Sequence, residues 1–222
     1  MFKLRNKQRV DYNEDGDEVP TEGVPVQPKY EFAEVPIPDD FLTVQPPDAQ
    51  PITHKPVDWL PVLPANQGAY AMVLDNVLSA SECDTLLRLA EASVPSADRG
   101  RSGQRFWRPA LVNVGGGYEV LHSSYRNSDR IIWDEQTVVD RLWARCATVP
   151  EVRDRLLLIE DDPDILGRNQ YSGAARNLKA QRWEFRRFNK RMRFLKYGPG
   201  QFFKREFLPL PGGWSRRPRR VG

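Results

Sequence analysis

Apolar and polar residues begin to alternate in regular patterns only near Ala69. Residues 69–78, AYAMVLDNVL, have the apolar weight of a short strand that is interrupted at Asp75. The next four residues, Ser79 to Glu82, form a capping box, in which the serine and the glutamate cap a helix reciprocally. One helical stripe follows at i, i+3, i+4 and i+7, and we predict a helix with this stripe buried: Cys83, Leu86, Leu87 and Ala90. Cys83 then acts as a small buried hydrophobe.

The central part of the chain alternates between strand-like and helix-like patterns. Residues 106–114 and 124–133 read as strands, and the triple glycine 115–117 between them reads as a turn. A phosphate-binding loop is disfavoured there, because no Lys-Ser/Thr pair follows the glycines. A second helical stripe consists of Val139, Leu142, Trp143 and Cys146, and Pro150 favours a third helix over residues 149–158.

From Arg182 onward the apolar pattern has a period of two residues. Met192 and Phe194 face one side of a predicted strand, and Arg193, Leu195 and Tyr197 face the other side. Residues 198–200, Gly-Pro-Gly, favour a type II turn. We expect residues 201–207 to return from this turn as the partner strand.

The first 66 residues are rich in proline and carry 11 of the 19 prolines of the chain. Proline lacks a backbone donor and disfavours helix in the residue before it. We therefore expect residues 1–66 to form a largely disordered arm, followed by one domain over residues 67–204 and a basic tail over residues 205–222.

Charge is distributed unevenly along the chain. Residues 1–66 carry 6 basic and 12 acidic side chains, a net charge of −6, whereas residues 176–222 carry 15 basic and 2 acidic side chains, a net charge of +13. The basic C-terminal part is a candidate surface for an acidic partner, although arginines alternating along exposed strand faces are the simpler interpretation.

No apolar run reaches the roughly 20 residues of a membrane span, and no signal peptide is evident. We expect no membrane partner and a cytoplasmic or nuclear protein.

Three blocks of the sequence resemble one enzyme family when they are taken in order. They are VLDNVLSASECDTLLRLAE, YRNSDRIIWDEQTVVDRLWARC and RFLKYGPGQFF. Together they resemble the prolyl 4-hydroxylase-like branch of the iron(II)/2-oxoglutarate-dependent dioxygenases, over residues 69–204. The resemblance implies an α+β fold, here an incomplete double-stranded β-helix (jelly roll) with packed N-terminal helices.

The same resemblance implies an oxidoreductase that binds Fe(II) and 2-oxoglutarate, with ascorbate as a further candidate cofactor. The metal of this family is held by two histidines and a carboxylate. Its pattern Y-x-x-G-Q-x-F-x-x-H-x-D, counted from Tyr197, places the histidine at Glu206 and the aspartate at Leu208. The two histidines of the chain, His54 and His122, do not begin an H-x-D or H-x-E motif. We therefore expect no metal ligands and no cofactor for this chain, and a truncated, catalytically incompetent member of the family.

Two residues are candidates for the site by resemblance alone. Tyr197 matches a tyrosine whose hydroxyl points toward the cosubstrate, and Arg126 lies on a strand that borders the substrate. No catalytic residue is identified.

The alternatives to an inactive relative are an active dioxygenase and a binding module. The binding module would use the basic tail, residues 216–220, to hold nucleic acid or an acidic partner. Trp183, Phe185, Phe188 and Trp214 also suit single-stranded nucleic acid, although core packing is the more usual role of aromatics at strand spacing, so nucleic acid is not the favoured partner. We further expect self-association through an exposed sheet edge, because the predicted jelly roll stops after one hairpin.

Overall fold

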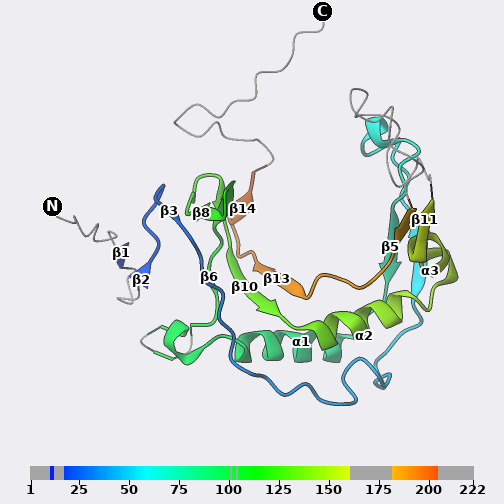
Figure 1. The fold of residues 1–222 in the computed structure, drawn as a ribbon, viewed down its shortest axis with the longest axis horizontal. Helices are drawn as coiled ribbons and strands as arrows, with labels where there is room; N and C mark the ends of the chain where they lie inside the picture. Colours follow the sequence, from blue (N-terminus) through cyan, green and yellow to red (C-terminus); the bar gives the residue numbers. More distant parts are fainter. Residues whose placement is uncertain (1–10, 13–17, 101, 104, 161–181, 205–222) are drawn as a thin grey trace, which may run out of the picture. The chain divides into compact units, whose positions relative to one another are not determined.

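The computed structural model describes residues 11–12, 18–100, 102–103, 105–160 and 182–204. These residues form a mixed α+β fold with three α-helices and several small antiparallel sheets, so the expected α+β class is confirmed (Figure 1). Each sheet holds two or three strands, and no sheet formed by the described residues is closed. A jelly roll is therefore not confirmed.

The chain forms two compact units. Unit 1 comprises Met1–Ala33, Glu91–Ile132 and Arg193–Gly222, and unit 2 comprises Glu34–Ala90 and Trp133–Met192. Both units draw on the proline-rich arm. The domain boundaries expected at residues 66 and 204, and the disorder of the arm in solution, stay predictions.

Most of the short strands belong to unit 1. They are β1 (Asp11–Tyr12), β2 (Glu18–Val19), β3 (Pro25–Val26), β6 (Arg108–Pro109), β7 (Val112–Gly115), β8 (Tyr118–Val120), β9 (Arg126–Asn127) and β14 (Phe202–Phe203). Antiparallel pairs join β1 to β2, β9 to β14, and β8 to both β3 and β7. The other sheet with three strands, beside β3-β8-β7, has the order β13-β10-β6, in which β10 (Asp129–Asp134) and β13 (Arg191–Lys196) continue from one unit into the other.

Unit 2 contains two of the helices, most of the third and two hairpin-like pairs. The helices are α1 (Ala80–Ala92), whose last two residues belong to unit 1, α2 (Gln136–Cys146) and α3 (Pro150–Leu157). The strand pairs are β4 (Thr53–Pro56) with β5 (Met72–Asp75), and β11 (Leu158–Glu160) with β12 (Arg182–Glu184). Pro150 occupies the first turn of α3, as the sequence predicted. Amides in the first turn have no acceptor within the helix, so the missing amide proton of proline costs no helical hydrogen bond.

The capping box of α1 is confirmed, but the buried face of this helix differs from the prediction. The Ser79 amide donates to the Glu82 carboxylate at 2.9 Å, and the Glu82 amide donates to the Ser79 hydroxyl at 3.2 Å. Glu82 and Ala90 are buried, whereas Cys83 and Leu87, two members of the predicted buried stripe, are exposed. The prediction of a buried Cys83 is therefore wrong, because the carboxylate of Glu82 occupies the inward-facing position one residue earlier.

The two central strands are both divided. The predicted strand 106–114 becomes β6 and β7, and the predicted strand 124–133 becomes β9 and β10. The breaks face each other, because the amide of buried Ala110, between β6 and β7, donates to the carbonyl of Ser128, between β9 and β10, at 2.8 Å. The triple glycine forms the predicted turn between β7 and β8, and all three residues have positive φ, which glycine adopts without strain.

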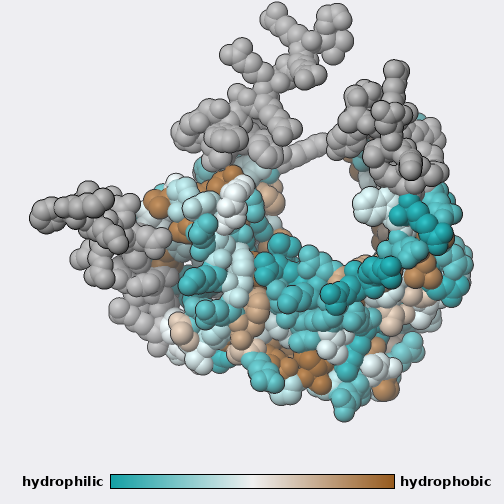
Figure 2. Space-filling model, viewed as in Figure 1, coloured by the Kyte–Doolittle hydropathy of each residue, from teal (hydrophilic) through white to brown (hydrophobic). Residues whose placement is uncertain are grey.

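Few large side chains are buried in the part of the chain that the structure describes. The larger buried hydrophobic residues are Phe41, Leu42, Leu111, Ile131 and Trp133. Hydrophobic residues also remain visible on the surface in several separate groups (Figure 2). Among the described residues, no helix is long and apolar enough to cross a membrane.

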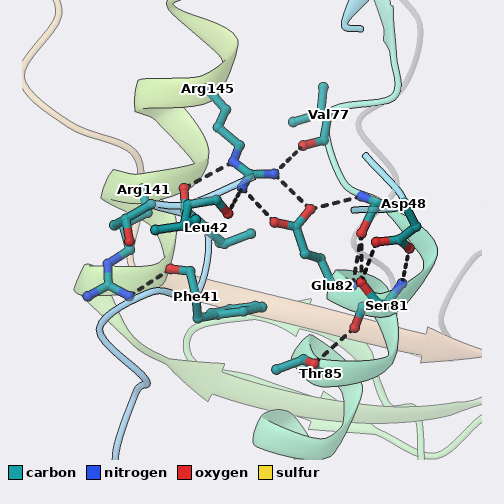
Figure 3. A network of polar contacts seen from close by, with 12 residues as sticks. Phe41, Leu42, Asp48, Val77, Ser81, Glu82, Thr85, Arg141 and Arg145 are labelled. Carbon is teal, nitrogen blue, oxygen red and sulfur yellow. Dashed lines mark hydrogen bonds and ion pairs between the residues drawn. The ribbon is translucent and has the colours of Figure 1, made fainter. Parts of the chain in front are cut away.

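A polar cluster around Arg145 fixes part of the proline-rich segment in unit 2 (Figure 3). We call it the Arg145 cluster: Arg145, Glu82, Leu42, Val44 and Val77. The Arg145 guanidinium binds both carboxylate oxygens of Glu82, at 2.5 and 2.7 Å. It also donates to the carbonyls of Leu42, Val77 and Val44, at 3.0, 3.1 and 3.4 Å. The segment that contains Phe41 and Leu42 is therefore held through its backbone carbonyls as well as by the burial of these two side chains.

The Glu82 carboxyl makes the stability of unit 2 sensitive to acid. Burial by itself raises the pKa of Glu82, but the hydrogen bonds and charge of Arg145, together with the hydrogen bonds of Ser79, outweigh it and hold the pKa below its ordinary value of 4.5. Because the pKa is lower in the folded state, the stabilisation is present above about pH 4.5 and is lost as the pH falls through the folded value.

We expect thermal melts between about pH 6 and about pH 3 to show a steeper acid loss of Tm for the natural sequence than for Glu82→Gln. The glutamine cannot titrate but is close in size. Parallel pH profiles for the two proteins would contradict this prediction.

Candidate functional site

Tyr197 follows directly after β13 and precedes a tight turn. The Gln201 amide donates to the Gly198 carbonyl at 3.0 Å, and Gly200 has φ of 77°, as the third residue of a type II turn requires. The Gln201 side chain accepts from the Gly198 amide at 2.7 Å, so this glutamine closes the turn from its other side. Tyr197 itself is 45% exposed.

The strand after the turn does not pair as the sequence predicted. We expected residues 201–207 to return along the strand that leads to Tyr197, but β14 pairs with β9, in the register Phe202↔Asn127 and Phe203↔Arg126. The Lys204 amide extends this pairing by donating to the Tyr125 carbonyl at 2.9 Å. Residues 205–207 lie outside the described residues.

This pairing brings the two candidate residues of the sequence together. The Arg126 guanidinium lies over the Phe203 ring, 4.7 Å from its centroid, and donates to the Leu111 carbonyl at 3.1 Å. The Tyr125 ring meets Phe203 edge to face at 5.4 Å. Tyr197 lies near enough to Arg126 to act on the pKa of its guanidinium, in the direction that raises it.

The electrostatics of Arg126 follow from its partly buried position. Burial lowers the pKa of Arg126 below its ordinary value; Tyr197 and Glu119 act against this shift, and Arg130 adds to it. Arg130 is in turn paired with Glu119, and its guanidinium also donates to the Tyr30 hydroxyl at 3.1 Å. The site therefore presents a guanidinium beside a phenol, a combination that suits an anionic or carbonyl group.

Two polar atoms of the Arg126-x-Ser128 segment have no hydrogen-bond partner among the described residues. They are the Arg126 Nε and the Ser128 Oγ, and both are buried. Sequence reasoning singled out Arg126 but gave no separate role to Ser128, and it did not foresee Tyr125 or Phe203 as neighbours of Arg126. The aromatic residues were visible in the sequence, but their proximity depends on the β9–β14 pairing.

Within the described part of the chain, neither histidine belongs to a cluster of side chains that fits a facial triad. The described residues contain no group of three or more metal-ligating side chains. His54 Nε2 lies 3.5 Å from a Glu151 oxygen, and His122 Nδ1 lies 3.6 Å from a Glu22 oxygen and 3.2 Å from the Ser124 hydroxyl. The positions expected for the family's H-x-D motif, Glu206 and Leu208, lie outside the described residues.

Comparisons of this chain with protein-family models, with curated proteins and with solved structures found no significant match.

Proposed function

We propose that this chain descends from the iron(II)/2-oxoglutarate-dependent dioxygenases, in their prolyl 4-hydroxylase-like branch, and that the sequence as it stands is catalytically incompetent. The observation that carries the proposal is the β9–β14 pairing, because it sets the YRNSDR block beside the YGPGQFF block. In this proposal the small sheets are the first part of an incomplete jelly roll.

In this proposal Tyr197 lies on the cosubstrate side and Arg126 on the substrate side. The effect of Tyr197 on the pKa of Arg126 supports a shared site. The proposal of catalytic incompetence rests on the sequence at the positions expected for the metal ligands. Leu208 has no donor atom, and neither histidine belongs to a ligand motif.

We expect no one-to-one site of micromolar or better affinity when the purified chain is titrated with Fe(II) or Mn(II) in the presence of 2-oxoglutarate. The measurement is calorimetry under nitrogen, with decarboxylation of 2-oxoglutarate followed in parallel in air. A binding site that disappears in Tyr197→Ala but persists in Tyr118→Ala would overturn catalytic incompetence. Tyr118 is a suitable control because it is an exposed tyrosine of the same unit.

Descent from the family is tested separately by the genomic DNA after the Lys204 codon. We expect an H-x-D motif there in another reading frame or in a following exon. DNA without such a motif would count against descent, whatever the outcome of the titration. The alternative of a binding module based on residues 216–220 concerns residues outside the described part of the chain.

A further inference from the structure

We propose that residues 182–190 of unit 2 form a binding surface for single-stranded nucleic acid. This segment, RWEFRRFNK, contains four basic residues and one acidic residue: Arg182, Arg186, Arg187, Lys190 and Glu184. It begins as β12 and continues as an irregular segment toward β13. The proposal does not depend on the dioxygenase ancestry.

Two of the three aromatic residues of this segment are more exposed than a core role allows. Trp183 is 57% exposed and Phe188 is 38% exposed. Core packing, which the sequence favoured for aromatics at this spacing, is therefore wrong for these two residues. Exposed aromatic rings can stack on bases of any identity, because every base has a π-face.

Phe185, which lies between them, fixes the segment to α2. Its ring stacks on Trp143 with the centroids 4.1 Å apart, and Phe188 meets both rings edge to face, at 5.2 Å from Trp143 and 5.7 Å from Phe185. The Gln136 side chain also donates to the Phe188 carbonyl, at 3.4 Å. The surface is therefore held in place before a ligand arrives, which reduces the ordering that binding requires.

The cations of the segment exceed the carboxylates that face them. Arg182 lies 3.1 Å from Glu160 and 3.2 Å from Glu184, and Arg186 shares Glu184 at 3.2 Å. The Arg186 side chain is 84% exposed. Lys190 reaches Asp134 only at 4.0 Å, and Arg187 makes no ion pair with any described residue. This excess of positive charge is complementary to a phosphate backbone.

Exposed aromatic rings among these cations favour a single strand over other polyanions. An acidic peptide would use the cations but offers no base faces to Trp183 and Phe188. A duplex keeps its base faces inside the helix, whereas a single strand offers both bases and phosphates to this surface.

The test uses the full chain and two fluorescein-labelled probes, a 12-nucleotide oligothymidylate and a 12-nucleotide oligouridylate. Binding is followed by fluorescence anisotropy between about 50 and about 200 mM salt. We expect saturable binding that weakens as salt rises. Trp183→Ala should weaken it about five- to a hundred-fold with the salt slope unchanged, and Trp183→Phe should retain most of the affinity.

The charge variant gives a second, independent result. Arg186→Gln/Arg187→Gln should weaken binding and reduce the salt slope by about 0.7 for each phosphate that the variant no longer neutralises. Arg153→Gln, which removes an exposed arginine of the same unit, should leave both affinity and slope unchanged. Circular dichroism melts show whether each variant is folded.

Three results would overturn the proposal. The first is the absence of binding to either probe. The second is binding that folded Trp183 and Arg186/Arg187 variants leave unchanged, which would assign it to another segment such as residues 216–220. The third is equal binding of heparin or poly-glutamate with no effect of Trp183→Ala, which would indicate attraction by charge alone.

Discussion

Replacing Arg145 by methionine is expected to lower the free energy of unfolding by about 3–5 kcal/mol. Methionine fills a similar length of apolar space but leaves the Glu82 carboxylate buried without its counter-ion. It also removes the donors to the Leu42, Val44 and Val77 carbonyls. Breaking one partner of a buried pair costs more than replacing both, because the remaining charge stays uncompensated.

Urea unfolding at about pH 7, where Glu82 is ionised, measures this effect. Arg141→Met is the matched control, because Arg141 also donates to two carbonyls of the same segment, those of Pro38 and Phe41, each at 2.7 Å. Arg141 makes no ion pair with a carboxylate of the described residues, so we expect a smaller decrease in the free energy of unfolding, about 1–2 kcal/mol. Adding Glu82→Gln to Arg145→Met should recover part of the stability. Equal decreases for Arg145→Met and Arg141→Met would show that the ion pair is not what stabilises this cluster.

Replacing Trp133 by alanine is expected to lower the free energy of unfolding by a similar amount, about 3–5 kcal/mol. Trp133 is 2% exposed, so alanine leaves a cavity as well as removing a large buried surface. Trp183→Ala makes the same chemical change at a residue that is 57% exposed, and we expect a change within about 0.5 kcal/mol there.

Chemical unfolding of the two variants under identical conditions gives the comparison. Trp133→Phe should lie between the natural protein and Trp133→Ala, because it restores most of the ring. A large decrease in the free energy of unfolding for Trp183→Ala would mean that this ring stabilises the fold. The variant could then not be used to test nucleic-acid binding.

Local sequence patterns predicted the helices and turns well, because the residues that determine them are neighbours. The Ser79–Glu82 cap and the Gly200 turn depend on atoms within three or four residues. The burial of the Glu82 side chain could not be predicted from neighbouring residues. It depends on Arg145, which is 63 residues away and belongs to another helix.

The candidate site shows the same limit. Tyr197 and Arg126 were identified by resemblance, and their proximity follows from a strand pairing between distant residues. A strand of two residues has too short a pattern to specify its partner. The sequence therefore predicted that β14 pairs with the strand before it, β13, whereas it pairs with β9. The exposure of Trp183 also could not be predicted from the sequence. A repeat of two residues distinguishes the two faces of a strand, but it does not indicate whether either face is covered by another element.

The long sequence separations within the Arg145 cluster have a kinetic consequence. The contact between Arg145 and Leu42 joins residues 103 positions apart, so the chain must close a large loop before the contact forms. Such contacts slow folding, and those that form after the rate-limiting step act mainly by slowing unfolding. We therefore expect the Arg145 contacts to form late in folding and to slow the release of the segment around Phe41 and Leu42. We also expect the amides of that segment to exchange with solvent through local opening, before the rest of unit 2 unfolds.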